Sequence, residues 1–354
     1  MSAHDKTYSV IGLMSGTSLD GIDIAHCIFE QPGDKWTYRI THAETLPYSP
    51  EWKLRLSVLE GDSALGFVQA DIEYGHLLGE LTRVFINKHA LKPDLIASHG
   101  HTIFHQPEKK ITCQIGRGSA ISAETGISVV CDFRSLDVAL GGQGAPLVPI
   151  GDQLLFGEYD FCLNIGGFTN ISYQSEGQRK AFDVCPANIV LNSLANKSGH
   201  DFDRGGELAG KGRVEAALLN KLNAIPYYLM EPPKSLGKEW VMENIFPVLK
   251  NYDFSPADLL ATFCEHIAIQ VGFVTGRDRS KKLLITGGGA FNHYLISRIR
   301  HHVLPDIIIP DHNTINYKEA LIFAFLGVLR LRNEVNCLRS VTGAIRDSSG
   351  GAIY

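Results

Sequence analysis

Hydroxyl, carboxylate and glycine residues are concentrated in one short segment near the start of the chain, SGTSLDG at residues 15–21. The apolar runs before and after it, the second with alternating isoleucines, indicate a β-hairpin. Glycines allow close backbone approach, and hydroxyls with successive N–H groups could grip a phosphate. Asp20 and Asp23 would repel bare phosphate, so we expect them to act through Mg²⁺ or ordered water. The alternative is an ordinary Gly/Asp hairpin turn.

This segment differs from a Walker loop, because it leads from strand to strand and lacks the Gly-Lys-Ser/Thr ending. We predict that it contacts the phosphates of a nucleotide. The predicted contacts are Gly16, Thr17, Ser18, Leu19, Asp20, Gly21, Ile22 and Asp23.

The pattern returns twice further along the chain. Residues 161–173, FCLNIGGFTNISY, again form an apolar run, a glycine turn with Gly166 and Gly167, and a second run. Residues 286–292, TGGGAFN, follow the strand-like KKLLI and precede a helical stretch, which suits a nucleotide at a helix N-terminus. Two hairpins that each open one half of the chain indicate two related lobes that grip one ligand. The third turn adds Gly287, Gly288, Gly289 and Asn292 to the nucleotide contacts.

Two further groups of residues could do chemistry. Asp183 follows an apolar pair at the end of a predicted strand, close behind the second hairpin, and is a candidate general base; the alternative is a turn-capping aspartate. His99, His101 and His105 have a spacing that zinc sites use, yet no cysteine or acidic ligand nearby completes a set of four. Loop histidines with a structural role, or histidines that contact a substrate, explain them better.

Length and composition limit the classes of protein. A chain of 354 residues, 44% hydrophobic and 20% charged, suits two domains that each bury a core. The formal charge of −5 argues against nucleic acid as a partner. The first ten residues lack an apolar signal core, and the longest apolar run, residues 320–329, is about half of a membrane span. Seven cysteines without a CxxC pair fit a reducing compartment, so we expect a cytoplasmic enzyme.

Two helices matter for the architecture. One is predicted over residues 63–88, with its apolar face formed by Leu65, Val68, Ile72, Leu78, Leu81 and Phe85. The other, residues 317–332, is apolar on nearly every side and should be buried. Glu319 lies in its first turn, where a carboxylate can cap the helix.

Six motifs together resemble the anhydro-N-acetylmuramic acid kinases, a family of the actin/Hsp70/sugar-kinase superfamily. In order along the chain they are GLMSGTSLDGID, GGQGAPLVP, LNIGGFTNIS, FD-x-x-P-x-N at 182–188, TGGGAFN and KEALIFAFL. The resemblance spans about residues 8–354 and implies an α/β fold of two ribonuclease-H-like (actin-like ATPase) lobes with a cleft between them. We expect the first lobe to comprise residues 1–133 and the second residues 134–334, with the tail 335–354 returning to the first.

The resemblance also implies an activity. It predicts an ATP- and Mg²⁺-dependent kinase in which Asp183 activates water to open a 1,6-anhydro sugar while O6 takes the phosphoryl group, and it directs Glu319 at that sugar. The implied substrate contacts are His99, His101, Asp137 and Gln143. The chain departs from the family at Val184, Cys185 and Ala187, in a motif that usually reads FD-T-G-P-G-N, and at His101, where the family commonly has Gln.

Two alternatives stay open at this point. One is a kinase of another anhydro sugar, such as levoglucosan. The other is a catalytically weak nucleotide-binding regulatory protein, suggested by the lost glycines around Asp183. A small-molecule sugar is the expected partner, without nucleic acid or membrane, and homodimer formation is left open.

Overall fold

The computed structural model describes residues 6–16 and 19–354. The chain forms two compact units, the first Met1–Leu155 with Tyr317–Tyr354 and the second Phe156–Asn316. Residues 134–155 and 317–334 thus belong to the first unit, whereas the sequence analysis assigned them to the second. Packing is the reason: a side chain on Gly12 of the first hairpin would meet the carbonyl oxygen of Ala320, and one on Gly151 would meet Ile322.

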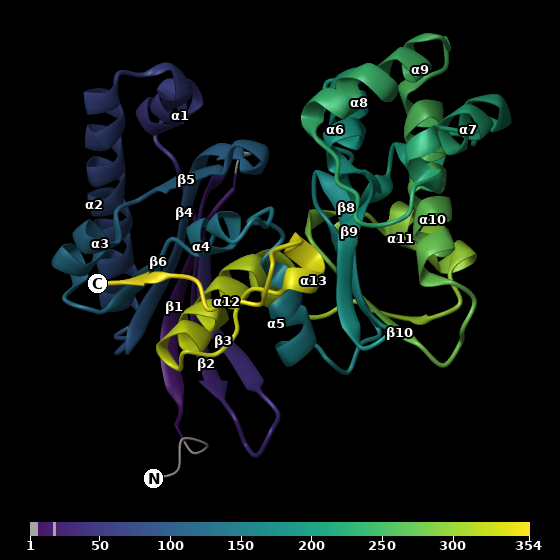
Figure 1. Ribbon diagram of the computed structural model, residues 1–354. Coiled ribbons are helices and arrows are strands. Elements are labelled where there is room, and N and C mark those ends of the chain that lie inside the picture. Colours follow the sequence, from purple (N-terminus) through teal and green to yellow (C-terminus); the bar gives the residue numbers. More distant parts are fainter. Residues whose placement is uncertain (1–5, 17–18) are drawn as a thin grey trace. The chain divides into compact units, whose positions relative to one another are not determined.

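The first unit is built on a seven-stranded sheet in the order β12-β6-β4-β1-β2-β3, with β5 paired to β4 (Figure 1). Its strands are β1 Tyr8–Ser15, β2 Gly21–Glu30, β3 Thr37–Pro47, β4 Leu95–Gln106, β5 Ile111–Ile115, β6 Val129–Cys131 and β12 Ala352–Ile353. β2 runs antiparallel to β1 and β3, while β4 and β6 run parallel to β1. This is ribonuclease-H-like topology, and the predicted hairpin over residues 8–29 is confirmed as β1–β2.

Helices cover both faces of this sheet. They are α1 Pro50–Val58, α2 Ala64–Lys88, α3 Gly118–Thr125, α4 Ser135–Ala139, α5 Val148–Leu155, α12 His312–Leu331 and α13 Arg339–Thr342. α12 packs on one face, where Gly327 lets it approach Ala97 of β4. The prediction that residues 320–329 are buried is confirmed.

The inward face of α2 differs from the prediction in part. Leu78 and Phe85 are buried as expected, but Leu65 and Val68 are exposed by 69% and 42%. The buried face instead carries Ala70, Tyr74, Gly75, Leu78, Gly79, Thr82 and Phe85. Small residues on this face allow α3 to pack closely against α2, a constraint that apolar periodicity does not reveal.

The second unit repeats the topology with a five-stranded sheet, β11-β10-β7-β8-β9. Its strands are β7 Phe161–Ile165, β8 Phe168–Ser175, β9 Gln178–Pro186, β10 Lys282–Thr286 and β11 Asp306–Ile308. The second predicted hairpin is confirmed as the antiparallel pair β7–β8, and β10 and β11 run parallel to β7. Its helices are α6 Asn188–Asn196, α7 Ala216–Asn223, α8 Lys238–Asn244, α9 Phe246–Lys250, α10 Pro256–Thr275 and α11 His293–His302.

The core of the second unit forms around α10. Ser255 caps this helix by accepting a hydrogen bond from the N–H of Asp258, as the sequence predicts. By length and composition α10 could cross a membrane, but two-thirds of its apolar window is buried inside the unit, as in the core helix of a folded domain. Phe263, Ile267 and Val271 are fully buried there.

Candidate active site

The second unit contains a cavity of about 300 Å³, a size typical of small-molecule sites. It is lined by Asn188, Leu191, Asn192, Phe202, Asp203, Gly205, Gly288, Gly289, Phe291, Asn292 and Asn316. Three predicted nucleotide contacts, Gly288, Gly289 and Asn292, therefore lie at one cavity. TGGGAFN connects β10 to α11 through a short 3-10 turn, Gly288–Phe291, and Asn292 caps α11.

The three glycines of this turn have different roles. A Cβ on Gly287, which has φ +81°, would lie 2.7 Å from the carbonyl oxygen of Ile165, and one on Gly289 would lie 2.2 Å from the Ile165 side chain. These two glycines let the turn approach β7. A Cβ on Gly288 would meet nothing nearer than Asn188 Nδ2 at 3.9 Å. Only Gly288 therefore keeps open space beside the cavity.

The hairpin turn at Gly166 and Gly167 is tied to the start of α6. Their carbonyl oxygens accept hydrogen bonds from the N–H groups of Ala187, Asn188 and Ile189, at 2.9–3.2 Å. Asn188 also lines the cavity. The structure thus brings the second hairpin turn and the TGGGAFN turn to the same end of the second unit.

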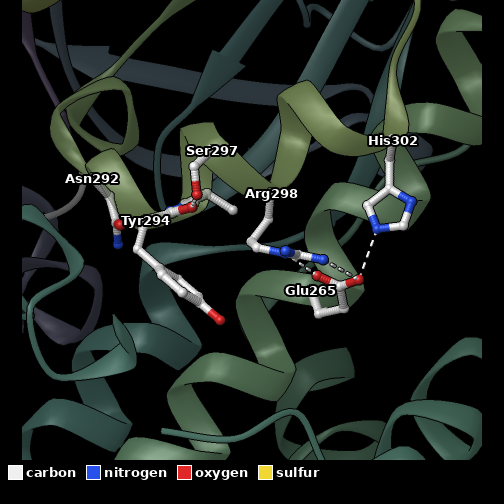
Figure 2. A network of polar contacts seen from close by, with 7 residues as sticks. Glu265, Asn292, Tyr294, Ser297, Arg298 and His302 are labelled. Carbon is white, nitrogen blue, oxygen red and sulfur yellow. Dashed lines mark hydrogen bonds and ion pairs between the residues drawn. The ribbon is translucent and has the colours of Figure 1, made fainter. Parts of the chain in front are cut away.

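A network of charged side chains holds α11, and with it Asn292, against α10 (Figure 2). Glu265 of α10 accepts from Arg298 Nε at 2.5 Å and lies 2.7 Å from His302 Nε2. Burial raises the pKa of Glu265, but the hydrogen bonds from Arg298 and His302 outweigh it, so the pKa lies below its usual value. At the other end of α11, Asn292 Oδ1 accepts from the N–H of Leu295 at 2.9 Å.

Asp183 is half-buried within β9, three residues before the strand ends, and not at its end as predicted. Its Oδ2 accepts from the N–H of Leu236 at 2.9 Å, while Oδ1 has no partner among the residues described. Burial raises the pKa of Asp183, and the hydrogen bond from the Leu236 N–H lowers it by less, so the pKa lies above its usual value. A carboxylate held by one oxygen, with the other available and its basicity raised, suits a general base.

The residues that replace the family's usual ones around Asp183 are accommodated in the core. Val184, Cys185 and Ala187 are buried by 98% or more, and none has positive φ. The register between β8 and β9 pairs Asp183 with Asn170 and Cys185 with Thr169, which leaves Val184 as an extra residue. Such a bulge re-aims neighbouring side chains. The backbone here therefore needs no glycine.

Lys234 is a member of the loop that covers Asp183. Its Nζ donates to the carbonyl oxygen of Tyr227 at 3.2 Å and lies 4.9 Å from the centre of the Tyr227 ring. The backbone carbonyl of Lys234 accepts from the N–H of Asp183. This loop thereby fixes the position of Asp183, a function that the sequence did not reveal.

The first hairpin turn is described in part. Thr17 and Ser18, predicted to bind phosphate, lie outside the described residues. Leu19 has φ +57°, and Ile22 is 99% buried, so the Ile22 side chain belongs to the core. Gly21 allows close approach to β3, since a Cβ would lie 2.5 Å from the Leu46 carbonyl oxygen. Gly16 is half-buried and its carbonyl oxygen accepts from the N–H of Leu19 at 3.4 Å.

Asp20 and Asp23 have the chemistry of a Mg²⁺ site. Burial raises the pKa of Asp23, a hydrogen bond from Thr45 at 2.6 Å lowers it, and the neighbouring Asp20 raises it again. The described residues hold no group of three or more His, Cys, Asp or Glu arranged for a metal. Mg²⁺ commonly takes one or two carboxylates, with waters and phosphates as its other ligands. The two carboxylates therefore fit this ion.

His99 does not have the free ring nitrogens of a substrate contact. Its Nδ1 lies 2.8 Å from the carbonyl oxygen of Gly100, and its Nε2 accepts from Arg134 at 2.9–3.1 Å. Burial keeps its pKa well below the usual value, so the ring is neutral. His99 instead orients Arg134, whose guanidinium also donates to the carbonyl oxygen of Gly144 at 2.6 Å. His105, the last histidine of the segment, is exposed.

Asp137, a predicted substrate contact, is held by hydrogen bonds within the first unit. It is 99% buried, and its carboxylate accepts from Thr342 Oγ1, from Cys337 Sγ and from the N–H of Gly144. These three hydrogen bonds hold the carboxylate inside the unit and leave it about one acceptor site. It shapes the loop that carries Gln143, whose side chain is exposed.

His101 is buried, and its Nδ1 lies 2.9 Å from Ser15 Oγ. The parallel pairing of β1 with β4 sets Ser15 opposite His101, beside an irregularity in the register. Burial lowers the pKa of His101 to about 4, so the ring is neutral at pH 7. The Ser15 hydroxyl is thus engaged inside the unit, whereas the sequence analysis counted it among the groups for phosphate.

Glu319 lies just after a kink in α12 at Tyr317, where the backbone leaves helical geometry. The helix starts at His312, five residues earlier than predicted, so the helical segment that contains Glu319 begins at the kink. Burial raises the pKa of Glu319, the positive charge of Arg134 lowers it, and the negative charge of Asp23 raises it. The pKa of Glu319 therefore lies above its usual value. Glu319, Arg134 and Asp23 are therefore close enough in the first unit to influence each other's charge.

Comparison with known proteins decides the family. The model of the family described as "Anhydro-N-acetylmuramic acid kinase" matches residues 8–354. The chain belongs to this family. Relatives that carry this name include proteins from Vibrio parahaemolyticus, 36% identical with 97% of each chain covered, and from Sulfurimonas denitrificans, 33% identical with 97% of this chain and 98% of the relative covered.

Solved structures that were matched to this chain are more distant in sequence than these relatives. One is an activator of 2-hydroxyisocaproyl-CoA dehydratase from Clostridium difficile with bound ADPNP, 12% identical, with a TM-score of 0.45 over 90% of this chain and 94% of that chain. Another is a ROK family glucokinase from Streptomyces griseus in complex with glucose and AMPPNP, also 12% identical. Its TM-score is 0.41, and the match covers 90% of this chain and 99% of the glucokinase chain.

Sequence reasoning missed several residues of this kinase-family chain. Asn192, Phe202 and Asp203 line the cavity through folding of α6 and the loop after it, and no local motif marks them. Arg134 was missed as well, because its partner His99 lies 35 residues away in the sequence.

Proposed function

We propose that the protein is an ATP-dependent kinase that opens the 1,6-anhydro ring of anhydro-N-acetylmuramic acid and phosphorylates O6. The product is N-acetylmuramic acid 6-phosphate, which places the enzyme in the recycling of cell-wall sugars. The observation that carries the proposal is Asp183: in a chain that matches the family over residues 8–354, it has one oxygen held and one available. No observation favours levoglucosan or a regulatory protein.

In the proposed reaction, Asp183 takes a proton from water as the water oxygen bonds to C1. The C1–O6 bond breaks, O6 keeps its electron pair and attacks the γ-phosphorus, and ADP leaves. Catalysis otherwise consists of positioning and of neutralising phosphate charge. Glu319 would contact the sugar, and its neighbour Arg134 would limit the build-up of negative charge around it.

The nucleotide would be held by the second-unit cavity, with Gly288 and Asn292 at the nucleoside and the Gly166–Gly167 turn near the phosphates. Asp20 and Asp23 would hold Mg²⁺, directly or through water, and the ion would neutralise phosphate charge. The sugar would also contact His101 and Gln143. The nucleotide phosphates would also contact the first hairpin turn, residues 16–21. We further propose a cytoplasmic location, with no nucleic acid or membrane as partner.

The test is a comparison of sugars. Purified protein is incubated with ATP and Mg²⁺ and with anhydro-N-acetylmuramic acid, levoglucosan or N-acetylmuramic acid, and ADP release and product mass are measured. The proposal expects rapid ADP release with the first sugar and a product heavier than that sugar by one phosphoryl group (HPO₃) and one water. Preferential turnover of levoglucosan, or ADP release that no sugar stimulates, would overturn it.

A further inference from the structure

Three groups of Asp183 make hydrogen bonds to one stretch of chain, the segment 227–236. The main-chain N–H of Asp183 donates to the Lys234 carbonyl oxygen at 3.2 Å, and its carbonyl oxygen accepts from the Tyr227 hydroxyl at 2.6 Å. The Leu236 N–H donates to the carboxylate at 2.9 Å. β9 is an edge strand of its sheet, so the segment pairs these main-chain groups in place of a further strand. The position of Asp183 thus depends on where this segment lies.

The segment 227–236 is closed on itself by the ammonium group of Lys234. This group donates to the Tyr227 carbonyl oxygen at 3.2 Å and lies 4.9 Å and 5.5 Å from the ring centres of Tyr227 and Phe182. The Tyr227 ring also packs against Trp240, with 5.1 Å between the ring centres. Contacts of a cation or an aromatic ring with another ring are attractive. The two residues that hold the Asp183 main chain, Tyr227 and Lys234, are therefore joined to each other.

A buried histidine of α10 connects this segment to the core of the second unit. The Tyr228 hydroxyl lies 2.9 Å from His266 Nε2, and His266 Nδ1 lies 2.7 Å from Asn223 Oδ1, which also accepts from Gln270 at 2.9 Å. His266 is fully buried, and burial lowers its pKa to about 3, so the ring is neutral at pH 7. Burying an imidazole is costly unless its nitrogens are hydrogen-bonded, and here both are. This polar contact gives the segment a defined place on α10, which apolar packing alone would not do.

We infer that Tyr227, Tyr228 and His266 are positioning residues for the general base. Tyr227 holds the Asp183 main chain, and the hydrogen bond between Tyr228 and His266 ties the segment 227–236 to α10. The inference rests on the proposed function, since it concerns the base of that same reaction. All three residues act through Asp183 and make no contact with the sugar or the nucleotide in this account. The base is thereby held in place before a ligand binds.

The first test measures this anchor in the absence of ligands. Tyr228→Phe deletes the hydroxyl that reaches His266, and His266→Phe keeps a buried ring without the two nitrogens. In both variants the amide hydrogens of Asp183 and Leu236 should exchange about 2–10-fold faster than in the wild type, the factor expected for one lost hydrogen bond. Residue-resolved hydrogen exchange gives these rates, and unchanged exchange in β7 and β8 shows that the fold is kept.

Tyr252→Phe is the matched control for this experiment. It also deletes a hydroxyl of the second unit that donates to a main-chain carbonyl oxygen, that of Ala217 at 3.5 Å. Exchange at Asp183 and Leu236 should stay that of the wild type in this variant. Wild-type exchange at both amides in Tyr228→Phe would overturn the inference.

The second test compares Tyr227→Phe in two backgrounds. In the otherwise wild-type protein, the change should lower kcat for the anhydro sugar about tenfold with the KM for ATP unchanged, because the base is present but held less firmly. In Asp183→Asn, the same change should have no further effect, since no base is left to position. Equal reductions in both backgrounds, which a purely structural role predicts, or a wild-type kcat in Tyr227→Phe, would contradict the inference.

Failure of the inference and failure of the proposed function give different results. If the wild-type protein turns over the anhydro sugar and Tyr227→Phe does so equally well, the inference is wrong and the proposed function stands. If the wild-type protein does not turn over the sugar, the proposed function is rejected. The exchange rates of Asp183 and Leu236 decide in either case whether α10 anchors the segment.

Discussion

At Asp183 a single physical cause, burial within β9, raises the basicity of the carboxylate, and the loop through Lys234 and Leu236 fixes where it points. A base with a raised pKa remains protonated to higher pH, so activity should fall as the pH falls through that value. The acid limb of kcat/KM for the sugar should lie above about pH 3.9, where an ordinary aspartate titrates. A limb at or below that pH would show that Asp183 is not the titrating base.

Asp183→Asn keeps the shape of the side chain and removes the proton acceptor. We expect kcat to fall about 10²–10⁴-fold with little change in ATP binding, because only the water step loses its base. Asp306→Asn, an exposed aspartate of the same unit, is the control and should keep wild-type kcat. Steady-state ADP release at saturating sugar measures both. A reduction below tenfold in Asp183→Asn would argue against its role.

The roles of some site residues could be predicted from the sequence and those of others could not, for identifiable reasons. Asp183 and the glycine turns stand out because a carboxylate or glycine next to an apolar strand is a local pattern. The hydrogen bonds of His99 and Asp137 could not be predicted, because their partners, Arg134 and residues 337–342, are distant in sequence or fold back only in three dimensions. Residue type alone does not say whether a polar group is already paired inside the protein.

Helices and strands were easier to predict where apolar residues recur at a regular spacing along the sequence. Both hairpins show alternation of apolar residues and appear as β1–β2 and β7–β8. β4 extends to Gln106 because the HGHTIFHQP segment pairs with β5, a long-range contact that the local pattern does not show. The face of α2 was partly wrong since close packing on α3 selects small residues over large apolar ones.

The TGGGAFN turn offers a test of the cavity. Gly288→Val should raise the KM for ATP strongly while the fold is kept, because of the three glycines in this turn only Gly288 has space for a side chain, and that space borders the cavity. Gly289→Val should instead reduce folded protein, since its Cβ would overlap Ile165. Gly61→Val, in open space in the first unit, is the control. Unchanged ATP affinity in folded Gly288→Val would remove this loop from the nucleotide site.

The α10–α11 network predicts a pH-dependent contribution to stability. The pKa of Glu265 is lowered in the folded state, so its contribution is present above the unfolded value of about 4.3 and is lost as pH falls through the lower folded value. Glu265→Gln should reduce the free energy of unfolding by about 1.5–3 kcal/mol at pH 7, measured by urea unfolding, and by less at pH 3. The exposed Glu243→Gln should change neither; an equal loss for both variants would contradict this assignment.

For the whole molecule, the sequence predicted two ribonuclease-H-like units, and the strand orders β3-β2-β1-β4-β6 and β9-β8-β7-β10-β11 confirm it. The unit boundaries were wrong because residues 134–155 and 317–334 pack on the first sheet, as the buried Lys318–Asp152 pair at 2.6 Å also shows. The amino-acid composition of the chain does not change at the ends of these two segments. Packing partners, which the sequence does not list, decide where a unit ends.

The central claim is that ring opening by water and phosphoryl transfer occur in one reaction, and oxygen labelling tests it most directly. The enzyme is run with anhydro-N-acetylmuramic acid and ATP in H₂¹⁸O, and the product is analysed by mass spectrometry with fragmentation. Unlabelled product held in H₂¹⁸O for the same time corrects for slow exchange at C1. We predict one ¹⁸O at C1 and none in the phosphate. A product without label at C1 and with the anhydro bridge intact would contradict the claim.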